Sequence, residues 1–216
     1  MSRHALVEHR PWLLAGVIAA FAYYFLSDNP IGELWLILLK GAGVGFLAIY
    51  ALRRAPGGDG KILGLALTLS ALADMALELW FEVGGGLFAL SHLTAIVLYL
   101  RYRREAPSIS QSMLGIALLI VVPAASYALS HDPLIGLYAA TLGTMAAAAW
   151  TSRFPRYRVG IGAVLFVVSD WLIFSQMGPY DLSPIPDLLV WPLYFAGQLM
   201  IATGVVQTLR GERPVP

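Results

Sequence analysis

Long apolar runs separated by short polar segments dominate the chain. We predict eight membrane-spanning helices from these runs, at about 11–27, 34–52, 62–80, 86–100, 111–130, 134–150, 159–176 and 188–208. Most of the runs reach the roughly 17–25 residues that a helix needs to cross a hydrocarbon layer of ~30 Å. The runs are continuous and do not alternate apolar with polar residues, which favours helices over barrel strands. The pattern therefore predicts an all-α, polytopic bundle of eight transmembrane helices, forming a single transmembrane domain over residues 1–216.

The composition supports a membrane protein. Of the 216 residues, 58% are hydrophobic and only 12% are charged, whereas a soluble domain carries about 25% charged residues. The net charge of +1 gives no reason to expect a nucleic-acid partner. The chain has no cysteine, which excludes disulfides, thiolate nucleophiles and metal sites built on sulfur. We expect an integral multi-pass protein of a bacterial inner membrane, with membrane lipids as its surroundings.

The basic residues lie on one side of the predicted membrane. If the N-terminus is cytoplasmic, the cytoplasmic segments hold thirteen of the fourteen Lys and Arg residues: Arg3, Arg10, Arg53, Arg54, Lys61, Arg101, Arg103, Arg104, Arg153, Arg156, Arg158, Arg210 and Arg213. The opposite segments carry only acidic charges: Asp28, Glu33, Glu82, Asp132, Asp181 and Asp187. Because cytoplasmic loops are enriched in Lys and Arg, this distribution predicts that both ends of the chain are cytoplasmic.

Several polar side chains lie within the predicted spans. Such groups are costly in hydrocarbon, so each is a functional candidate. Counted along the predicted helices at 1.5 Å per residue, five of them lie roughly 9–10 Å below the outer end of their helix. These are Lys40, Asp74, His92, Asp170 and Tyr194. Because five helices carry polar groups at one depth, we predict a polar pocket in the outer half of the bundle.

Most of these candidates also have a structural explanation. Lys40 could serve solely to neutralise a carboxylate, with no contact to a substrate. Glu78 is close enough to the interface to be simply solvated. His92 could be a hydrogen-bonded core histidine, while Tyr194 and Gln198 could form hydrogen bonds between helices. The sequence leaves these alternatives open.

The two buried aspartates are harder to explain structurally. Asp74 and Asp170 lie deep in two different spans, and a single lysine cannot pair fully with both. Ser70, Asp74 and Glu78 are spaced by four residues, which places them on one helix face. We therefore expect the aspartates to carry the chemistry.

Several other chemistries are not indicated. The chain contains no G-x-S-x-G motif of the kind used by serine hydrolases. Its four histidines do not form a metal-ligand pair: His4, His9, His92 and His131. A metal held by the carboxylates is weakly supported, so we expect neither a metal nor a cofactor.

Five stretches, taken in order, resemble a known family. They are Lys40, Ser70-x-x-Ala73-Asp74-x-x-Leu77, Phe81-x-x-Gly84-x-x-x-Phe88-x-x-x-His92, Gly162-Ala163-x-x-Phe166-x-x-Ser169-Asp170 and Tyr194-x-x-x-Gln198. Their order and spacing resemble the YhhN-type lysoplasmalogenase family of integral membrane hydrolases. The chain departs from the family pattern where Gly41 replaces a proline, Ala73 a glycine and Ala95 a tyrosine.

The resemblance implies a reaction and a set of roles. The reaction is hydrolysis of the vinyl ether bond of a lysophospholipid substrate, giving a fatty aldehyde and a glycerophospho-base. Such a bond requires a proton donor and a group that activates water, the logic of inverting glycosidases. Asp74 and Asp170 are expected to form this acid and base pair, in an order that is left open. Six residues are expected to bind or orient the substrate: Lys40, Glu78, His92, Ser169, Tyr194 and Gln198.

Two other functions remain possible from the sequence. The pocket could belong to a proton-coupled transporter of a small molecule or lipid, with the aspartates as proton or cation sites. The absence of a matching polar path in the cytoplasmic half favours the hydrolase. A third possibility is a structural or sensor protein whose pocket only binds lipid. The oligomeric state is left open.

Overall fold

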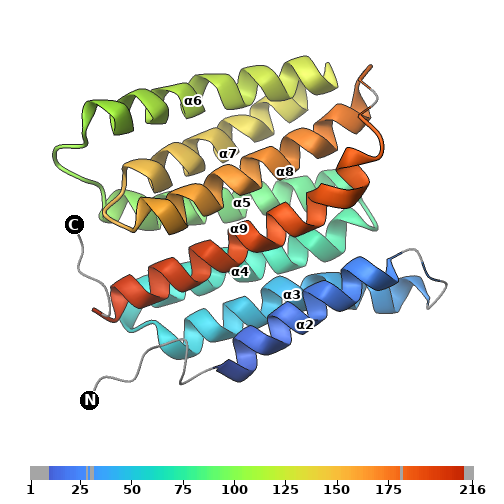
Figure 1. Cartoon of the computed structure of the whole chain (residues 1–216), viewed down its shortest axis with the longest axis horizontal. Helices are drawn as coiled ribbons and strands as arrows, with labels where there is room; N and C mark the ends of the chain where they lie inside the picture. The colour runs from blue at the N-terminus through green and yellow to red at the C-terminus, as the bar shows by residue number, and fades with distance from the viewer. Residues whose placement is uncertain (1–9, 28, 30–31, 181, 212–216) are drawn as a thin grey trace. The chain divides into compact units, whose positions relative to one another are not determined.

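The computed structural model describes residues 10–27, 29, 32–180 and 182–211, and within these ranges the chain is helical apart from short connections (Figure 1). The α-helices are α2 (Arg10–Leu26), α3 (Glu33–Arg54), α4 (Gly57–Leu77), α5 (Phe81–Arg101), α6 (Ile109–Ser130), α7 (Pro133–Thr151), α8 (Ile161–Met177) and α9 (Ile185–Leu209). A short π-helix, η1 (Arg156–Gly160), leads directly into α8. The predicted all-α class is confirmed.

Each predicted span corresponds to one helix of the described chain. Among the described residues, seven segments are long and apolar enough to cross a membrane: α3, α4, α5, α6, α7, η1 together with α8, and α9. The remaining helix, α2, is apolar but has only 17 residues, about 25 Å of helix. The protein is therefore an integral, multi-pass membrane protein with seven clear candidate spans and one shorter apolar helix.

The connection between α4 and α5 differs from the predicted boundaries. Helix α4 ends at Leu77, so Glu78 is the C-cap residue and does not lie inside a span. The chain then reverses at 78–80, and α5 begins five residues before the predicted start. The reversal brings Gly84 against the end of α4, where a Cβ on Gly84 would lie 2.6 Å from Leu77 Cγ. Residues 78–80 therefore form the connection, and residues 81–85, which were predicted to lie between the spans, belong to α5.

The chain divides into two compact units, and the first is built around α3. This unit comprises the residues up to Ala95 and the stretch from Ala202, and therefore contains α2, α3, α4 and most of α5. Helix α3 packs against both α2 and α4. Small residues allow these contacts, because a Cβ on Gly16 would lie 3.0 Å from the Gly43 carbonyl oxygen. The backbones of α2 and α3 consequently approach closely, as small-residue interfaces permit.

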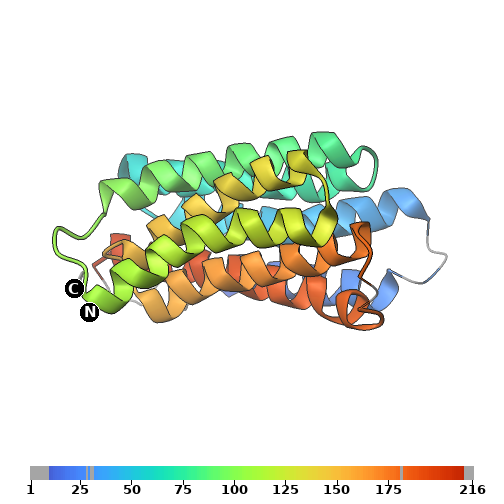
Figure 2. The ribbon, with the colours of Figure 1, turned by 90° about the horizontal axis from the view of Figure 1, so that it is seen from above.

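The second unit, residues 96–201, is built on the pair α6 and α7. These helices lie side by side and α8 packs against both (Figures 1 and 2). A short turn joins α6 to α7. In this turn Asp132 accepts a hydrogen bond of 2.8 Å from the Leu134 backbone N–H, and Pro133 occupies the first helical position. Both features are typical of a helix start.

Helices α8 and α9 meet through two glycines of the second unit. A Cβ on Gly162 would lie 2.7 Å from the Gly197 carbonyl oxygen, and a Cβ on Gly197 would lie 2.6 Å from the Gly162 oxygen. The two backbones are thus in direct contact, with no space for a side chain between them. Ser169 and Asp170 follow Gly162 along α8, and Tyr194 and Gln198 lie on either side of Gly197 in α9.

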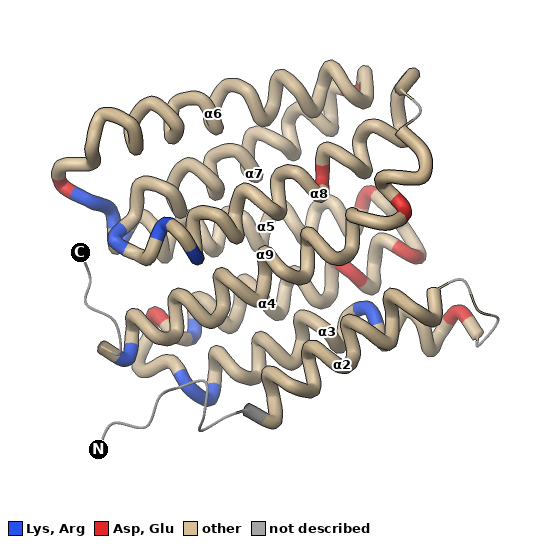
Figure 3. Tube along the Cα trace, in the orientation of Figure 1, with Lys and Arg blue, Asp and Glu red and all other residues tan. Residues whose placement is uncertain are grey.

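Charged residues separate toward opposite helix ends within each unit (Figure 3). At one end lie the basic connections: Arg53, Arg54 and Lys61 in the first unit, and Arg101, Arg103, Arg104, Arg153, Arg156 and Arg158 in the second. The other end carries Glu33 and Glu82 in the first unit and Asp132 and Asp187 in the second. Asp59 and Glu105 are acidic residues at the basic ends. Four charges used for the topology lie outside the described residues: Arg3, Asp28, Asp181 and Arg213.

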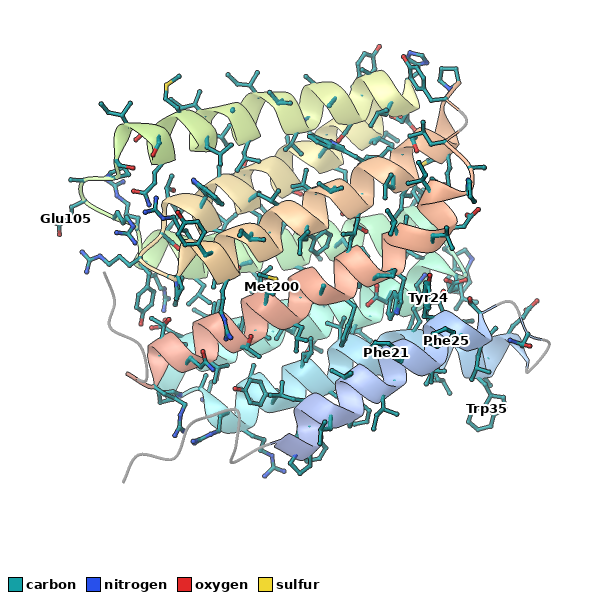
Figure 4. The ribbon with its side chains drawn as sticks, viewed as in Figure 1. Phe21, Tyr24, Phe25, Trp35, Glu105 and Met200 are labelled. Carbon is teal, nitrogen blue, oxygen red and sulfur yellow. The ribbon has the colours of Figure 1, made fainter. Side chains whose placement is uncertain are left out.

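Large apolar side chains cover the outer surfaces of the helices. Phe21 and Phe25 on α2 have 59% and 67% of their surfaces exposed. Trp35 on α3, which stands clear of the ribbon in Figure 4, is 66% exposed. A soluble protein seldom exposes so many large apolar groups together. These side chains are suited to contact with lipid tails.

We predict that Gly162→Ala lowers the free energy of unfolding by about 1–3 kcal/mol, because the added methyl group has to separate α8 from α9. Thermal unfolding of the detergent-purified protein would measure this. The matched control is Gly86→Ala on α5, where a Cβ meets nothing within 4 Å, and there the better helix propensity of alanine should stabilise slightly. Equal effects of both substitutions would contradict the close crossing.

Candidate active site

The first unit contains an ion pair between two of the predicted site residues. The Lys40 ammonium on α3 pairs with the Glu78 carboxylate at the end of α4. From α2, the Tyr23 hydroxyl donates a hydrogen bond of 3.4 Å to Glu78 Oε1. The Tyr23 ring lies beneath the ammonium, with 5.5 Å between Lys40 Nζ and the ring centroid, a distance typical of a cation–π contact. Three helices thus contribute one side chain each to this cluster.

Asp74 lies one helical turn before Glu78 and is 2% exposed. Lys40 interacts electrostatically with Asp74 as well as with Glu78. The neighbouring Gly41 lets α3 approach α4 here, since a Cβ on Gly41 would lie 2.6 Å from Met75 Sδ and 3.0 Å from the Ala71 carbonyl oxygen. A bulkier residue at Gly41 would therefore move Lys40 away from the two carboxylates.

The remaining predicted residues of this unit lie on α4 and α5. Ser70 and Ser91 share a hydrogen bond of 2.8 Å, and the Ser91 hydroxyl also donates to the Ala66 carbonyl oxygen at 2.8 Å. These contacts fasten α4 to α5 one turn from Asp74. The adjacent His92 is 1% exposed, and its ring stacks on Phe88 with 6.3 Å between centroids. His92 is therefore a core residue of this unit.

The second unit holds Asp170 near the middle of α8. Its side chain is 6% exposed, and its Oδ2 atom accepts a hydrogen bond of 2.7 Å from the Tyr138 hydroxyl on α7. The Tyr138 ring in turn meets Phe174 edge-on, with 5.9 Å between centroids. Aromatic packing thus orients the phenol that holds this carboxyl group.

The last three predicted residues connect α8 with α9. The Ser169 hydroxyl donates to the Val190 carbonyl oxygen at 2.9 Å. Tyr194 packs edge-on against Phe166 at 5.0 Å, and Gln198 donates to the Tyr194 hydroxyl at 3.5 Å. Ser169 therefore acts as a link between helices, and Tyr194 and Gln198 form a polar pair on one face of α9.

The structure groups part of the predicted set. Lys40, Asp74 and Glu78 interact within the first unit, and Asp170 lies in the second unit with Tyr138. The alternative explanation of Lys40 as a neutralising charge agrees with its pairing to Glu78, whereas Glu78 is engaged in contacts and is not merely solvated. The expected approach of Asp74 to Asp170 stays a prediction, as do the catalytic roles.

Two tyrosines of the site were missed by the sequence analysis. Tyr138 lies five residues from the start of α7 and Tyr23 three from the end of α2. Each therefore lies within two turns of a helix end. In the predicted spans both tyrosines lie four residues from the outer end, about 6 Å, so the depth count that selected the charged candidates does not select them. In the described part of the chain, no three His, Asp or Glu side chains gather in a way that could hold a metal ion.

Comparison with known proteins decides the family. The model of the YhhN family matches residues 35–205 of this chain. The chain belongs to the YhhN family. The matched stretch includes all eight site residues predicted from the sequence and Tyr138, whereas Tyr23 precedes it.

Curated relatives agree with this assignment. The chain is 29% identical to the bovine protein named lysoplasmalogenase TMEM86A over 199 residues, which cover 83% of this chain and 76% of the relative. It is 28% identical to proteins named lysoplasmalogenase from Mycobacterium bovis and Mycobacterium tuberculosis over 173 residues. Those matches cover 73% of this chain and 65% of the mycobacterial proteins. No solved structure matches the chain.

The contact between Tyr138 and Asp170 gives a stability prediction. In a double-mutant cycle of Tyr138→Phe and Asp170→Ala, we expect a coupling of about 1–2 kcal/mol in the free energy of unfolding, because each substitution removes the same buried hydrogen bond. Chemical unfolding in detergent would measure it. Tyr127→Phe, an exposed tyrosine on α6, is the control and should be additive with Asp170→Ala. Additivity for Tyr138 as well would show that the hydrogen bond does not form.

Proposed function

We propose that this YhhN-family protein hydrolyses the vinyl ether bond of lysoplasmalogen-type lysophospholipids. Membership of the family and the names of the relatives support a lysoplasmalogenase-like hydrolase of the membrane. The products would be a fatty aldehyde and a glycerophospho-base. The structural observation that most supports this reaction is that Asp74 and Asp170 are carboxyl groups buried within apolar helices, both inside the family-matched stretch.

The chemistry of a vinyl ether suits a pair of carboxyl groups. A proton added to the β-carbon turns the C=C–O unit into an oxocarbenium ion. Water then attacks the carbon next to oxygen and loses a proton, which gives a hemiacetal. The hemiacetal collapses to the aldehyde and releases the glycerol oxygen as a hydroxyl group. One carboxyl group must supply a proton and another must accept one from water, as in glycosidases that use two carboxylates.

We assign these two roles to Asp74 and Asp170, with the order left open. Tyr138 would act as a positioning residue, because its hydroxyl holds one oxygen of Asp170 and leaves the other available to substrate or water. The remaining predicted residues would bind substrate or orient the pair: Lys40, Glu78, His92, Ser169, Tyr194 and Gln198. Among these, Ser169 precedes Asp170 in α8 and would contribute by fastening α8 to α9.

We further propose how the protein lies in the membrane. All eight helices would span it as a single transmembrane domain, with both ends of the chain cytoplasmic and the polar site in the outer half. The supporting observation is that basic residues gather at one end of the helices within each unit, and such residues favour the cytoplasmic side. We propose the inner membrane of a bacterium as its location.

The proposed activity predicts aldehyde release from a 1-alkenyl lysophospholipid by the detergent-purified protein. Asp74→Asn and Asp170→Asn should each lower the rate at least about 100-fold, the usual contribution of a general acid or base. Glu82→Gln, an exposed carboxylate at the start of α5, is the matched control and should keep the full rate. In oxygen-18 water, the glycerophospho-base should remain unlabelled, because the bond to the vinyl carbon is the one that breaks.

Other outcomes would point elsewhere. No aldehyde from folded protein would contradict the hydrolase, and flux of the lipid across sealed vesicles without cleavage would favour transport. Full activity in both Asp variants would contradict the proposed pair.

The topology can be tested because the chain has no native cysteine. We expect a cysteine at Leu182, between α8 and α9, to react with a membrane-impermeant maleimide in intact cells. A cysteine at Ala106, between α5 and α6, should react only after the membrane is opened. Both native side chains are exposed. A difference in labelling between the two cysteines would therefore report the side of the membrane and not burial within the protein. The reverse labelling pattern would invert the proposed orientation.

A further inference from the structure

The acidic end of the first unit offers two opposite charges and an aromatic ring at one place. Lys40, Glu78 and Tyr23, here called the head-group cluster, come from α3, the end of α4 and α2. The side chain of Lys40 is 16% exposed and that of Glu78 is 39% exposed. The pair is thus within reach of a ligand at the surface, although it lies next to the buried Asp74.

We propose that the head-group cluster binds the zwitterionic head group of a lysophospholipid, an inference that rests on the proposed hydrolase function. The Lys40 ammonium would bind the phosphate oxygens, for which lysine acts as a compact point charge. The Glu78 carboxylate and the face of the Tyr23 ring would bind the ammonium of ethanolamine or choline. Carboxylates and aromatic faces are the groups that recognise such cations in proteins.

Charge balance favours a zwitterion over an anion at this place. Without ligand, Lys40 and Glu78 neutralise each other. A zwitterion can replace these partners without leaving a charge unpaired, which matters most for Lys40, whose side chain is only 16% exposed. A phosphoglycerol head group has a phosphate but no cation. This phosphate would compete with the Glu78 carboxylate for Lys40. Glu78 and the nearby Asp74 would then face an additional negative charge.

The position of the cluster also agrees with the reaction. Asp74 and Glu78 are four residues apart, which corresponds to about 6 Å along a helix axis. In a lysophospholipid, the three-carbon glycerol unit separates the phosphate from the ether oxygen by a comparable length. A head group held by Lys40 and Glu78 would therefore leave the vinyl ether beside Asp74. The hydrogen bond from Tyr23 to Glu78 would hold the carboxylate in place for the ammonium.

Binding can be tested separately from hydrolysis with 1-alkyl lysophospholipids, whose saturated ether cannot be cleaved by this route. We would measure their affinity for the purified protein with phosphoethanolamine, phosphocholine and phosphoglycerol head groups. The wild type should bind both zwitterions about tenfold more tightly than phosphoglycerol, a preference that corresponds to one well-formed charged contact. In Glu78→Gln this preference should fall to about threefold or less, while Glu82→Gln should retain it.

A second variant keeps the test independent of how well Glu78→Gln folds. Tyr23→Leu removes the ring from α2 and should weaken binding of phosphocholine about threefold, with little effect on phosphoglycerol. Equal affinity of the wild type for all three head groups, or an undiminished preference in Glu78→Gln, would overturn the head-group site. Selective binding without aldehyde release would overturn the proposed hydrolase but support the head-group site. Hydrolysis without head-group selectivity would overturn the head-group site but support the hydrolase.

Discussion

The high cost of an isolated charge in hydrocarbon is the constraint on which the rest of this structure depends. The basic residues of the described part of the chain satisfy it by lying at or near helix ends, apart from Lys40 inside α3. Lys40 pairs with Glu78, which lies just beyond the end of α4. This pairing requires α3 and α4 to lie close together, and Gly41 provides the space. The charge pairing of Lys40 therefore depends on the close helix packing at the adjacent Gly41.

Close helix contacts at glycine have a similar effect in the second unit. Gly162 and Gly197 bring the backbones of α8 and α9 together, and one further hydrogen bond joins Ser169 to the Val190 carbonyl oxygen. Asp170 follows Ser169 on α8, so its position depends on this crossing. Without a strong hydrophobic force between helices in lipid, small residues and polar contacts are what hold such helices in register. The residues around this carboxyl group therefore also hold α8 against α9.

The polar residues of the candidate site could be found largely from the sequence, while their partners could not. Asp74 and Asp170 stand out because carboxylates are rare in apolar runs. Tyr138 does not stand out, because tyrosine is common in membrane helices and its importance depends on a contact with a residue 32 positions away. For the same reason the sequence left open whether Glu78 is only solvated, whereas the structure pairs it with Lys40 just beyond the end of α4 at Leu77. The boundaries at the turn between α4 and α5 were equally hard to predict, because apolar residues continue on both sides of the turn at 78–80.

The sequence by itself determined the all-α class, the approximate positions of the apolar helices in the described part of the chain, and the separation of basic from acidic helix ends there. These features follow from local hydropathy and from charge, which each segment carries independently of its neighbours. Only the tertiary structure decided which polar groups meet: Lys40 with Glu78 and Tyr23, and Asp170 with Tyr138. Such pairings depend on how far one helix slides and turns against the next. That register is set by the fit of small residues at the interfaces, a property of two helices together that neither segment contains alone.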